Sequence, residues 1–158
     1  MATSLEDLRI LKSAEAIADA VWKRVAQWDE FARDVVGKQL ARATDSIGAN
    51  IAESFGRFNY GEKIQFLYYS RGSLFETKYW LNRARTRELL GSSEVEEYNS
   101  KLTDVARQLN AFVDSLKTQR SDSKTKAIRE NAAEYNFDLL NDFSDTLFDD
   151  SELNWLQA

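Results

Sequence analysis

The stretch "VEEYNSKLTDVARQLNAFVDSL", residues 95–116, is the part of the chain that decides the fold. Its apolar residues recur at alternating spacings of three and four, which is typical of a helix with one buried seam. A helix of this kind needs other helices to pack against, so the stretch predicts a helical bundle. The apolar residues are Val95, Tyr98, Leu102, Val105, Leu109, Phe112 and Leu116.

The rest of the chain favours long helices joined by short turns. None of the 158 residues is proline, which would break a helix interior. Glycine-containing turns stand at 56–61 and 91–93, where Gly91 is expected to end one helix and a serine to begin the next. We therefore predict an all-α, antiparallel up-down-up-down four-helix bundle over residues 1–119. Its first three helices are expected at about 5–26, 29–55 and 62–90.

The first two predicted helices each carry an apolar pattern at helical spacing. Asp29 is the expected N-cap of the second helix. In the first helix the pattern comprises Leu8, Leu11, Ala14, Ala18, Val21, Trp22 and Val25, and in the second Phe31, Val35, Val36, Leu40, Ala43, Ile47 and Ile51.

The composition excludes several function classes. The chain has no cysteine and no histidine, so disulfides, thiolate nucleophiles, imidazole bases and the usual zinc and di-iron sites are ruled out. We predict no catalytic residue, cofactor or metal ligand, and therefore a protein that is not an enzyme. Neither a secretory signal nor an apolar run of membrane-spanning length is visible, so a cytoplasmic location is expected.

All of the excess negative charge lies in the C-terminal tail, residues 120–158. This tail has 4 basic and 9 acidic residues, which accounts for the whole net charge of −5. Acidic residues alternate with apolar ones, a pattern typical of a segment that is partly disordered alone and docks on something. Two alternatives stay open: the tail docks in a partner's groove, or it covers the chain's own basic residues. The expected docking residues are Leu140, Phe143, Leu147 and Trp155.

The predicted helix at 62–90 has a second apolar stripe opposite its core face: Ile64, Tyr68, Phe75 and Tyr79. A monomeric bundle needs only one apolar face per helix, so this stripe predicts an oligomer interface. Basic residues border it, and basic side chains interleaved with aromatic ones can also hold nucleic acid or a partner. The two readings can coexist. The candidate binding residues are Arg57, Lys63, Arg71, Lys78, Arg83, Arg85 and Arg87.

The stretch "DSIGANIAESFGR", residues 45–57, places polar groups where a simple amphipathic helix would carry apolar ones. Buried polar groups persist only with partners, which predicts a structural network across a helix–helix seam. Gly48, with its neighbours Ala49 and Ala52, would allow another helix to approach closely. The predicted network consists of Ser46, Asn50, Glu53, Arg71 and Ser73.

Two segments carry a resemblance to a known family. "QLARATDSIGANIAESFGR" (39–57) and "FLYYSRGSLFETKYWLNRAR" (66–85) resemble the signature of four-helix-bundle proteins encoded in intervening sequences of bacterial 23S rRNA genes. The same family includes the accessory variability determinant of diversity-generating retroelements. The resemblance extends over about Leu11 to Gln119 and is specific from Gln39 to Glu76. Gly48 stands where the family pattern has proline.

The resemblance implies a barrel-like homopentamer of bundles without enzymatic activity. In the retroelement branch it also implies binding to a reverse transcriptase and its template RNA through a basic surface. We therefore expect a non-enzymatic oligomeric adaptor for a reverse transcriptase, RNA or both. The alternative is a protein-binding module that acts through the acidic tail without nucleic acid.

Overall fold

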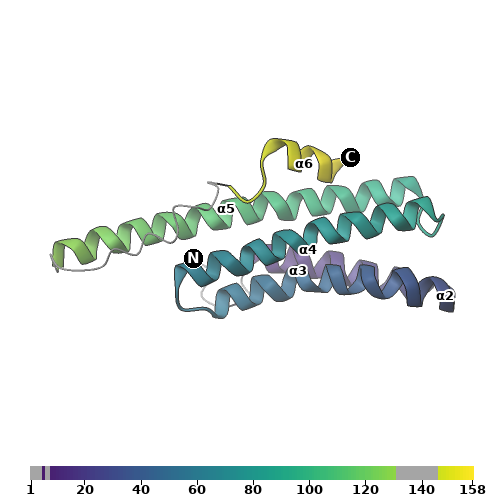
Figure 1. Ribbon diagram of the computed structural model, residues 1–158, viewed down its shortest axis with the longest axis horizontal. Helices are drawn as coiled ribbons and strands as arrows, with labels where there is room; N and C mark the ends of the chain where they lie inside the picture. The colour runs from purple at the N-terminus through teal and green to yellow at the C-terminus, as the bar shows by residue number, and fades with distance from the viewer. Residues whose placement is uncertain (1–4, 6–7, 131–145) are drawn as a thin grey trace.

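The computed structural model describes residues 5, 8–130 and 146–158, with side chains over 5, 8–123 and 146–158. These residues form helices and connecting turns, without a strand among them, so the all-α prediction is confirmed (Figure 1). The elements are α1 (Arg9–Val25), α2 (Glu30–Ala32), the π-helix η2 (Arg33–Gly37), α3 (Lys38–Gly56), α4 (Tyr60–Thr86), α5 (Ser92–Glu130) and α6 (Asp150–Gln157).

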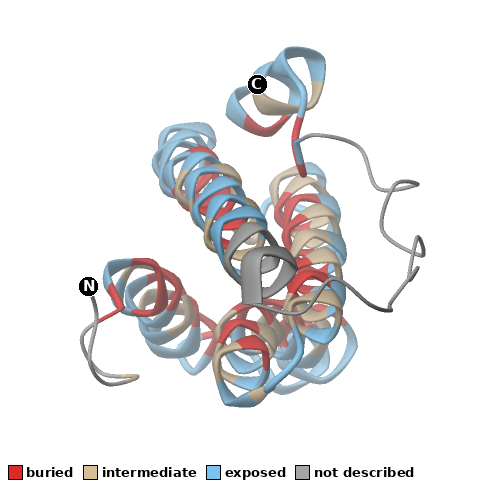
Figure 2. Cartoon of the chain, turned by 90° about the vertical axis from the view of Figure 1, so that its left-hand side faces the viewer, coloured by how far each residue is buried: buried red, intermediate tan, exposed pale blue. Residues whose placement is uncertain are grey.

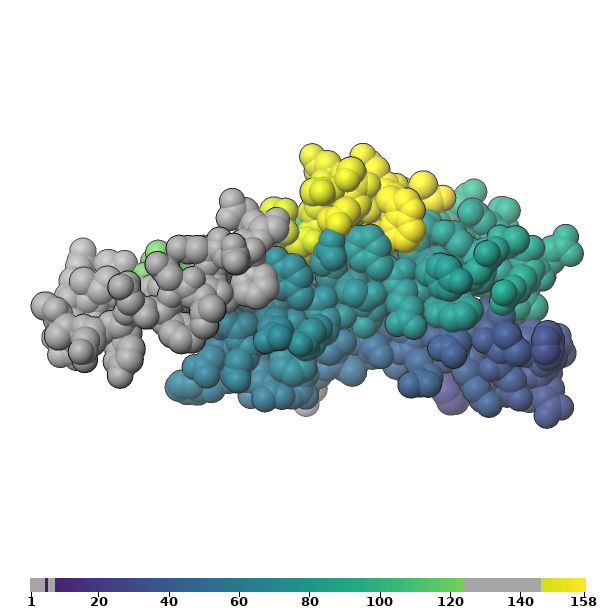
Figure 3. Space-filling view, in the orientation of Figure 1, coloured from purple at the N-terminus to yellow at the C-terminus, as the bar shows by residue number. Residues whose placement is uncertain are grey.

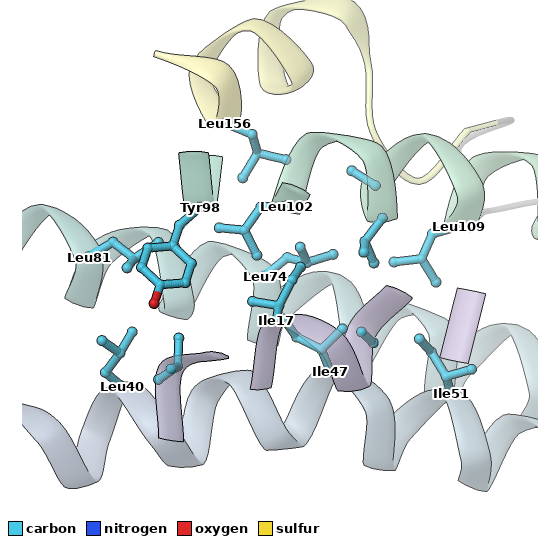
Figure 4. Close-up of a cluster of buried hydrophobic side chains, with 14 of the residues drawn as sticks. Ile17, Leu40, Ile47, Ile51, Leu74, Leu81, Tyr98, Leu102, Leu109 and Leu156 are labelled. Atoms are coloured by element: carbon cyan, nitrogen blue, oxygen red, sulfur yellow. The ribbon is translucent and has the colours of Figure 1, made fainter. Parts of the chain in front are cut away.

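Four long helices form the body of the molecule. α3 packs against α1 and α4, and α5 packs against α4 and α1, so the four surround a shared interior. Seen along the bundle, their buried faces turn inward (Figure 2). Ile17, Ile47, Leu74, Leu102 and Leu109 come from all four helices and are fully buried together (Figure 4). Burial of this apolar surface is the main force that holds the helices together.

α5 is longer than the seam that predicts it. It continues past Gln119 to Glu130 and extends beyond the other helices (Figure 1). After residues 131–145, which are outside the described part of the chain, α6 lies on the outside of α5. Residues 146–158 therefore rest on the bundle, with Leu156 of α6 pointing toward Leu102 (Figure 4). Among the predicted docking residues, Leu147 is buried and Trp155 stacks on Phe75, whereas Leu140 and Phe143 lie outside the described residues.

The turn between α4 and α5 differs from the expectation. α4 ends at Thr86, and the residue with a left-handed backbone is Glu88, with φ of 59°, instead of Gly91. The carbonyl of Ala84 accepts hydrogen bonds from the amides of Leu89 (2.9 Å) and Leu90 (3.4 Å). These bonds satisfy a carbonyl that has no partner within α4. The chain therefore completes its turn before Gly91.

Three residues of the predicted core pattern are exposed. Phe31 is 78% exposed, Trp22 67% and Val35 45%, whereas Val36 next in the chain is buried. The physical reason for Val35 is the π-helix η2, which begins at Arg33 and changes the phase of the pattern. Phe31 lies in the three-residue α2, whose single buried residue is Ala32. The predicted N-cap is observed: Asp29 Oδ1 accepts from the amide of Ala32 at 3.0 Å.

Candidate nucleic-acid interface

The seven basic residues predicted to bind nucleic acid or a partner do not form one surface. They divide into a cluster beneath α6, a group at the C-terminal end of α4, and a pair at the turn between α3 and α4. Each group has different partners and a different degree of burial. The cluster beneath α6 is Arg71 and Lys78, the group at the end of α4 is Arg83, Arg85 and Arg87, and the pair at the turn is Arg57 and Lys63.

Arg71 is the centre of the contact between α4 and the tail. Its Nε donates to the carbonyl of Leu147 at 2.6 Å, and its guanidinium forms an ion pair with Glu152. The guanidinium also lies over the rings of Phe75 (4.8 Å to the centroid) and Phe148 (5.6 Å). Charge-assisted bonds to oxygen and stacking on aromatic faces both use the planar fork that only arginine has.

Aromatic stacking and backbone bonds complete the docking of the tail. Phe75 of α4 stacks against Phe148 (5.9 Å between centroids) and against Trp155 (5.4 Å). From α5, the Asn110 side chain donates to the Phe148 carbonyl (2.8 Å) and accepts from the Phe148 amide (2.9 Å). Leu156 is fully buried. In the space-filling view this segment, in yellow, covers part of α4 and α5 (Figure 3).

Lys78 is buried beneath the tail and is only 2% exposed. Its Nζ lies 5.7 Å from the centre of the Trp155 ring, a cation–π contact. No described residue accepts a hydrogen bond from this Nζ. Burial, and then the charge of Arg85, lower the pKa of Lys78 to about 8. Its ammonium is therefore not at the surface while the tail is docked.

The C-terminal end of α4 presents the more accessible positive charge. Arg87 is exposed, and Arg83 and Arg85 are half-buried. Arg85 is within 3.4 Å of the Asn82 side-chain oxygen, and no ion pair among the described residues involves these three arginines. Tyr79, one to two turns before them, is 53% exposed. No carboxylate of the described residues therefore competes for an anion at this arginine group, in which the Arg83 Nε is itself buried.

The pair at the α3–α4 turn is engaged in local contacts. Arg57 forms an ion pair with Glu53 and lies over the ring of Phe66, 4.7 Å from its centroid. Lys63 Nζ is 3.5 Å from the Phe55 carbonyl and 6.0 Å from the Phe55 ring centre. Both side chains are half-buried. These contacts hold the two helices at the turn.

The four residues of the predicted oligomer stripe lie in three environments. Ile64 is buried in the chain's own core, and Phe75 is half-buried beneath the tail aromatics. Tyr68 is half-buried, and burial raises the pKa of its phenol. Only Tyr79 is exposed. The sequence pattern therefore could not show that a segment of the same chain covers part of this stripe.

The five residues of the predicted polar network do not form one network, because they have separate partners. Asn50 Nδ2 donates to the carbonyl of Ser46 at 2.9 Å and reaches the Ser73 hydroxyl at 3.4 Å, which connects α3 to α4. Glu53 pairs with Arg57, and Arg71 faces the tail instead. A groove of about 420 Å³ lies between α1 and α3, and Gly48, Ala49 and Ala52 form part of its lining.

Sequence reasoning missed several residues that position the tail. Asn110 of α5 bonds the backbone of Phe148, and Glu152 of α6 pairs with Arg71 of α4, but each looks like an ordinary surface residue in the sequence. One local signal was present: Asp149 and Glu152 have the spacing of a capping box, and their reciprocal bonds measure 2.9 and 3.0 Å. It predicts where α6 begins, though not where α6 docks.

Comparison with known proteins identifies the family. A family model described as 23S rRNA-intervening sequence protein matches residues 6–111, more than half of the 158-residue chain. The match takes in α1 to α4 and α5 as far as Ala111, and α6 lies beyond it. No curated protein was found to match the chain. No helix of the described residues has the length and apolar character needed to cross a membrane. The chain belongs to the 23S rRNA-intervening sequence protein family.

Proposed function

We propose that the chain is a non-enzymatic, oligomeric accessory protein that binds RNA through the C-terminal end of α4. The observation that carries this proposal is the group of Arg83, Arg85 and Arg87, which no carboxylate of the described residues neutralises. Arginines contact phosphate oxygens in pairs of parallel bonds, and an exposed aromatic such as Tyr79 offers a surface for a base.

The family supports the proposed partners, RNA and a reverse transcriptase. Its name ties these proteins to rRNA genes, which supports an RNA-associated role. The resemblance to the retroelement accessory protein supports a reverse transcriptase as the protein partner, with RNA held between the two. The absence of histidine and cysteine from the whole chain supports an adaptor role over a catalytic one. We place the protein in the cytoplasm.

The proposed assembly is a barrel-like homopentamer of up-down-up-down four-helix bundles. Its support within the chain is a set of large apolar side chains that the folded monomer leaves exposed. Exposed apolar groups of this size are typical of protein–protein contacts when they gather on one surface. They are Trp22 on α1, Phe31 and Val35 on α2 and η2, and Tyr69 and Tyr79 on α4.

The test is a paired charge reversal. Arg85→Glu with Arg87→Glu should weaken binding of a labelled single-stranded RNA and reduce the slope of log affinity against log salt by about 1–2. The matched control reverses the exposed Lys101 and Arg107 on α5, with the same change in net charge. Fluorescence anisotropy at several salt concentrations measures both. Equal losses in the two variants would contradict a specific site on α4.

A further inference from the structure

A second cationic and aromatic cluster lies under the tail, apart from the arginines at the end of α4. It consists of Arg71, Phe75 and Lys78, which α4 places one turn apart along the same side. In the folded chain, residues 146–158 cover all three. The question is what these residues would bind without the tail.

The tail satisfies the cluster with the same chemical groups that a nucleotide carries. The Glu152 carboxylate is the anion on Arg71, in the position that a phosphate oxygen would take. The Phe148 and Trp155 rings stack on Phe75 nearly in parallel, at interplanar angles of 17° and 21°, as a base would stack. An anion on a guanidinium beside a stacked ring is the arrangement that single-stranded nucleic acid needs.

Lys78 shows that the tail satisfies the cluster incompletely. Its ammonium is buried with no hydrogen-bond acceptor among the described residues, and Trp155 offers only its ring. An unpartnered buried cation opposes docking, because desolvation is not repaid by hydrogen bonds. A residue that served only to pack the tail would be apolar here. A phosphate oxygen would supply the missing acceptor once the tail has left.

We propose that Arg71, Phe75 and Lys78 form a binding site for a nucleotide unit of single-stranded RNA, and that the acidic tail occupies this site as an internal competitor. The inference rests on the proposed RNA-binding function and deepens it. Tail docking and RNA binding at this cluster exclude each other, because both require the Phe75 ring and the same guanidinium. The observed affinity is then the intrinsic affinity multiplied by the fraction of molecules with an open tail.

The experiment opens the tail in the full-length chain. Leu156→Asp places a charge at a fully buried position of α6, whereas Gln157→Asp adds the same charge at an exposed neighbour. The probe is a fluorescein-labelled single-stranded oligoadenylate. We expect Leu156→Asp to bind it at least tenfold more tightly than Gln157→Asp does. Amide hydrogen exchange of residues 150–157 verifies that only Leu156→Asp has opened α6.

The tighter oligoadenylate binding of Leu156→Asp must depend on Arg71, Phe75 and Lys78. Adding Arg71→Gln to Leu156→Asp should abolish the gain, and adding Phe75→Leu should reduce it for oligoadenylate but leave binding of inorganic polyphosphate unchanged. If Leu156→Asp fails to fold by circular dichroism, Asn110→Ala opens the tail more gently, because it removes the two bonds to the Phe148 backbone.

The outcomes separate the two proposals. An opened tail with unchanged oligoadenylate affinity overturns the internal competitor, while loss of binding on reversal of Arg85 and Arg87 still supports the α4 site. A tighter complex that survives Arg71→Gln also overturns it, because displacement of the acidic tail alone would then explain the gain. If neither the wild-type nor the opened chain binds RNA, the proposed function fails as well.

Discussion

Two glycines of the bundle have opposite structural roles. A β-carbon added at Gly37 would lie 2.5 Å from Val25 Cγ1 and 3.4 Å from the Trp28 ring. At Gly48, the nearest atom would be Leu11 Cδ1 at 3.6 Å, an ordinary contact. Gly37 is therefore required by close packing of η2 against α1, whereas Gly48 is not required by space within the chain.

The pair gives a prediction for unfolding. Gly37→Ala should lower the unfolding free energy by about 1–3 kcal/mol, because Val25 is β-branched and cannot move its methyl group away easily. Gly48→Ala should raise it by about 0.5–1 kcal/mol, the gain in helix propensity. Urea denaturation followed by circular dichroism measures both. Destabilisation by Gly48→Ala would indicate that a segment of another chain packs closely against this glycine.

At the scale of the element, α6 depends on its own first turn. Asp149 accepts hydrogen bonds from the Glu152 amide and the Ser151 hydroxyl, and these bonds hold the pKa of the Asp149 carboxyl below its ordinary value. Asp149→Ala should thus increase amide exchange in α6 severalfold, whereas Asp150→Ala, which changes no cap, should leave it nearly unchanged. Since the pKa of Asp149 is lowered in the folded chain, this protection is present above the ordinary carboxyl range and is lost as pH falls.

The buried lysine beneath α6 predicts an effect of the same sign in the alkaline range. The pKa of Lys78 is lowered from 10.5 to about 8, so the unfolded chain binds the extra proton between these values and stability rises with pH. The full shift is worth on the order of 3 kcal/mol. The positive charge of Arg85 contributes to the lowering of the Lys78 pKa, after burial. Lys78→Met should therefore be more stable than the wild type at pH 7.5, with a smaller advantage at pH 9.5.

Urea denaturation at the two pH values tests this, with Lys101→Met on the exposed face of α5 as the control. The upper pH stays below 10, because burial raises the pKa of the Tyr98 phenol and its ionisation would add an opposing term. An advantage of Lys78→Met that is equal at both pH values would show that folding does not lower the pKa of Lys78.

Elements built on unbroken periodicity were predictable, and those decided by distant contacts were not. The α5 seam holds because Val95, Leu102 and Leu109 are all fully buried, as their spacing predicts. Val35 was misplaced because a π-helix adds a residue to the turn without an obvious mark in the sequence. The acidic pattern left open that the tail covers the chain's own basic residues, but its contact with Phe75 could not be assigned, because the partners Phe148 and Trp155 are about 70–80 residues away along the chain.

At the scale of the whole molecule, the surface left after the tail has docked determines how copies can meet. Ile64 and Phe75 are covered within the chain and Tyr68 is half-buried, so Tyr79 is the one member of the predicted stripe on α4 that is exposed. Two exposed apolar side chains lie close together in sequence on α2 and η2: Phe31 is 78% exposed and Val35 45%. We therefore expect this region to carry the contact between neighbouring subunits, with α4 left for RNA.

Phe31→Ser with Val35→Ser should shift the assembly toward monomers without unfolding the bundle. Both side chains are exposed in the single chain, so their loss costs the monomer little, whereas removal of each apolar side chain costs an interface about 2 kcal/mol. Phe58→Ser, at the most exposed aromatic, is the matched control. Native mass spectrometry at micromolar concentration should give a pentamer for the wild type and the control. Dissociation by Tyr79→Ser and not by the paired variant would place the interface on α4, where it would compete with RNA for the same surface.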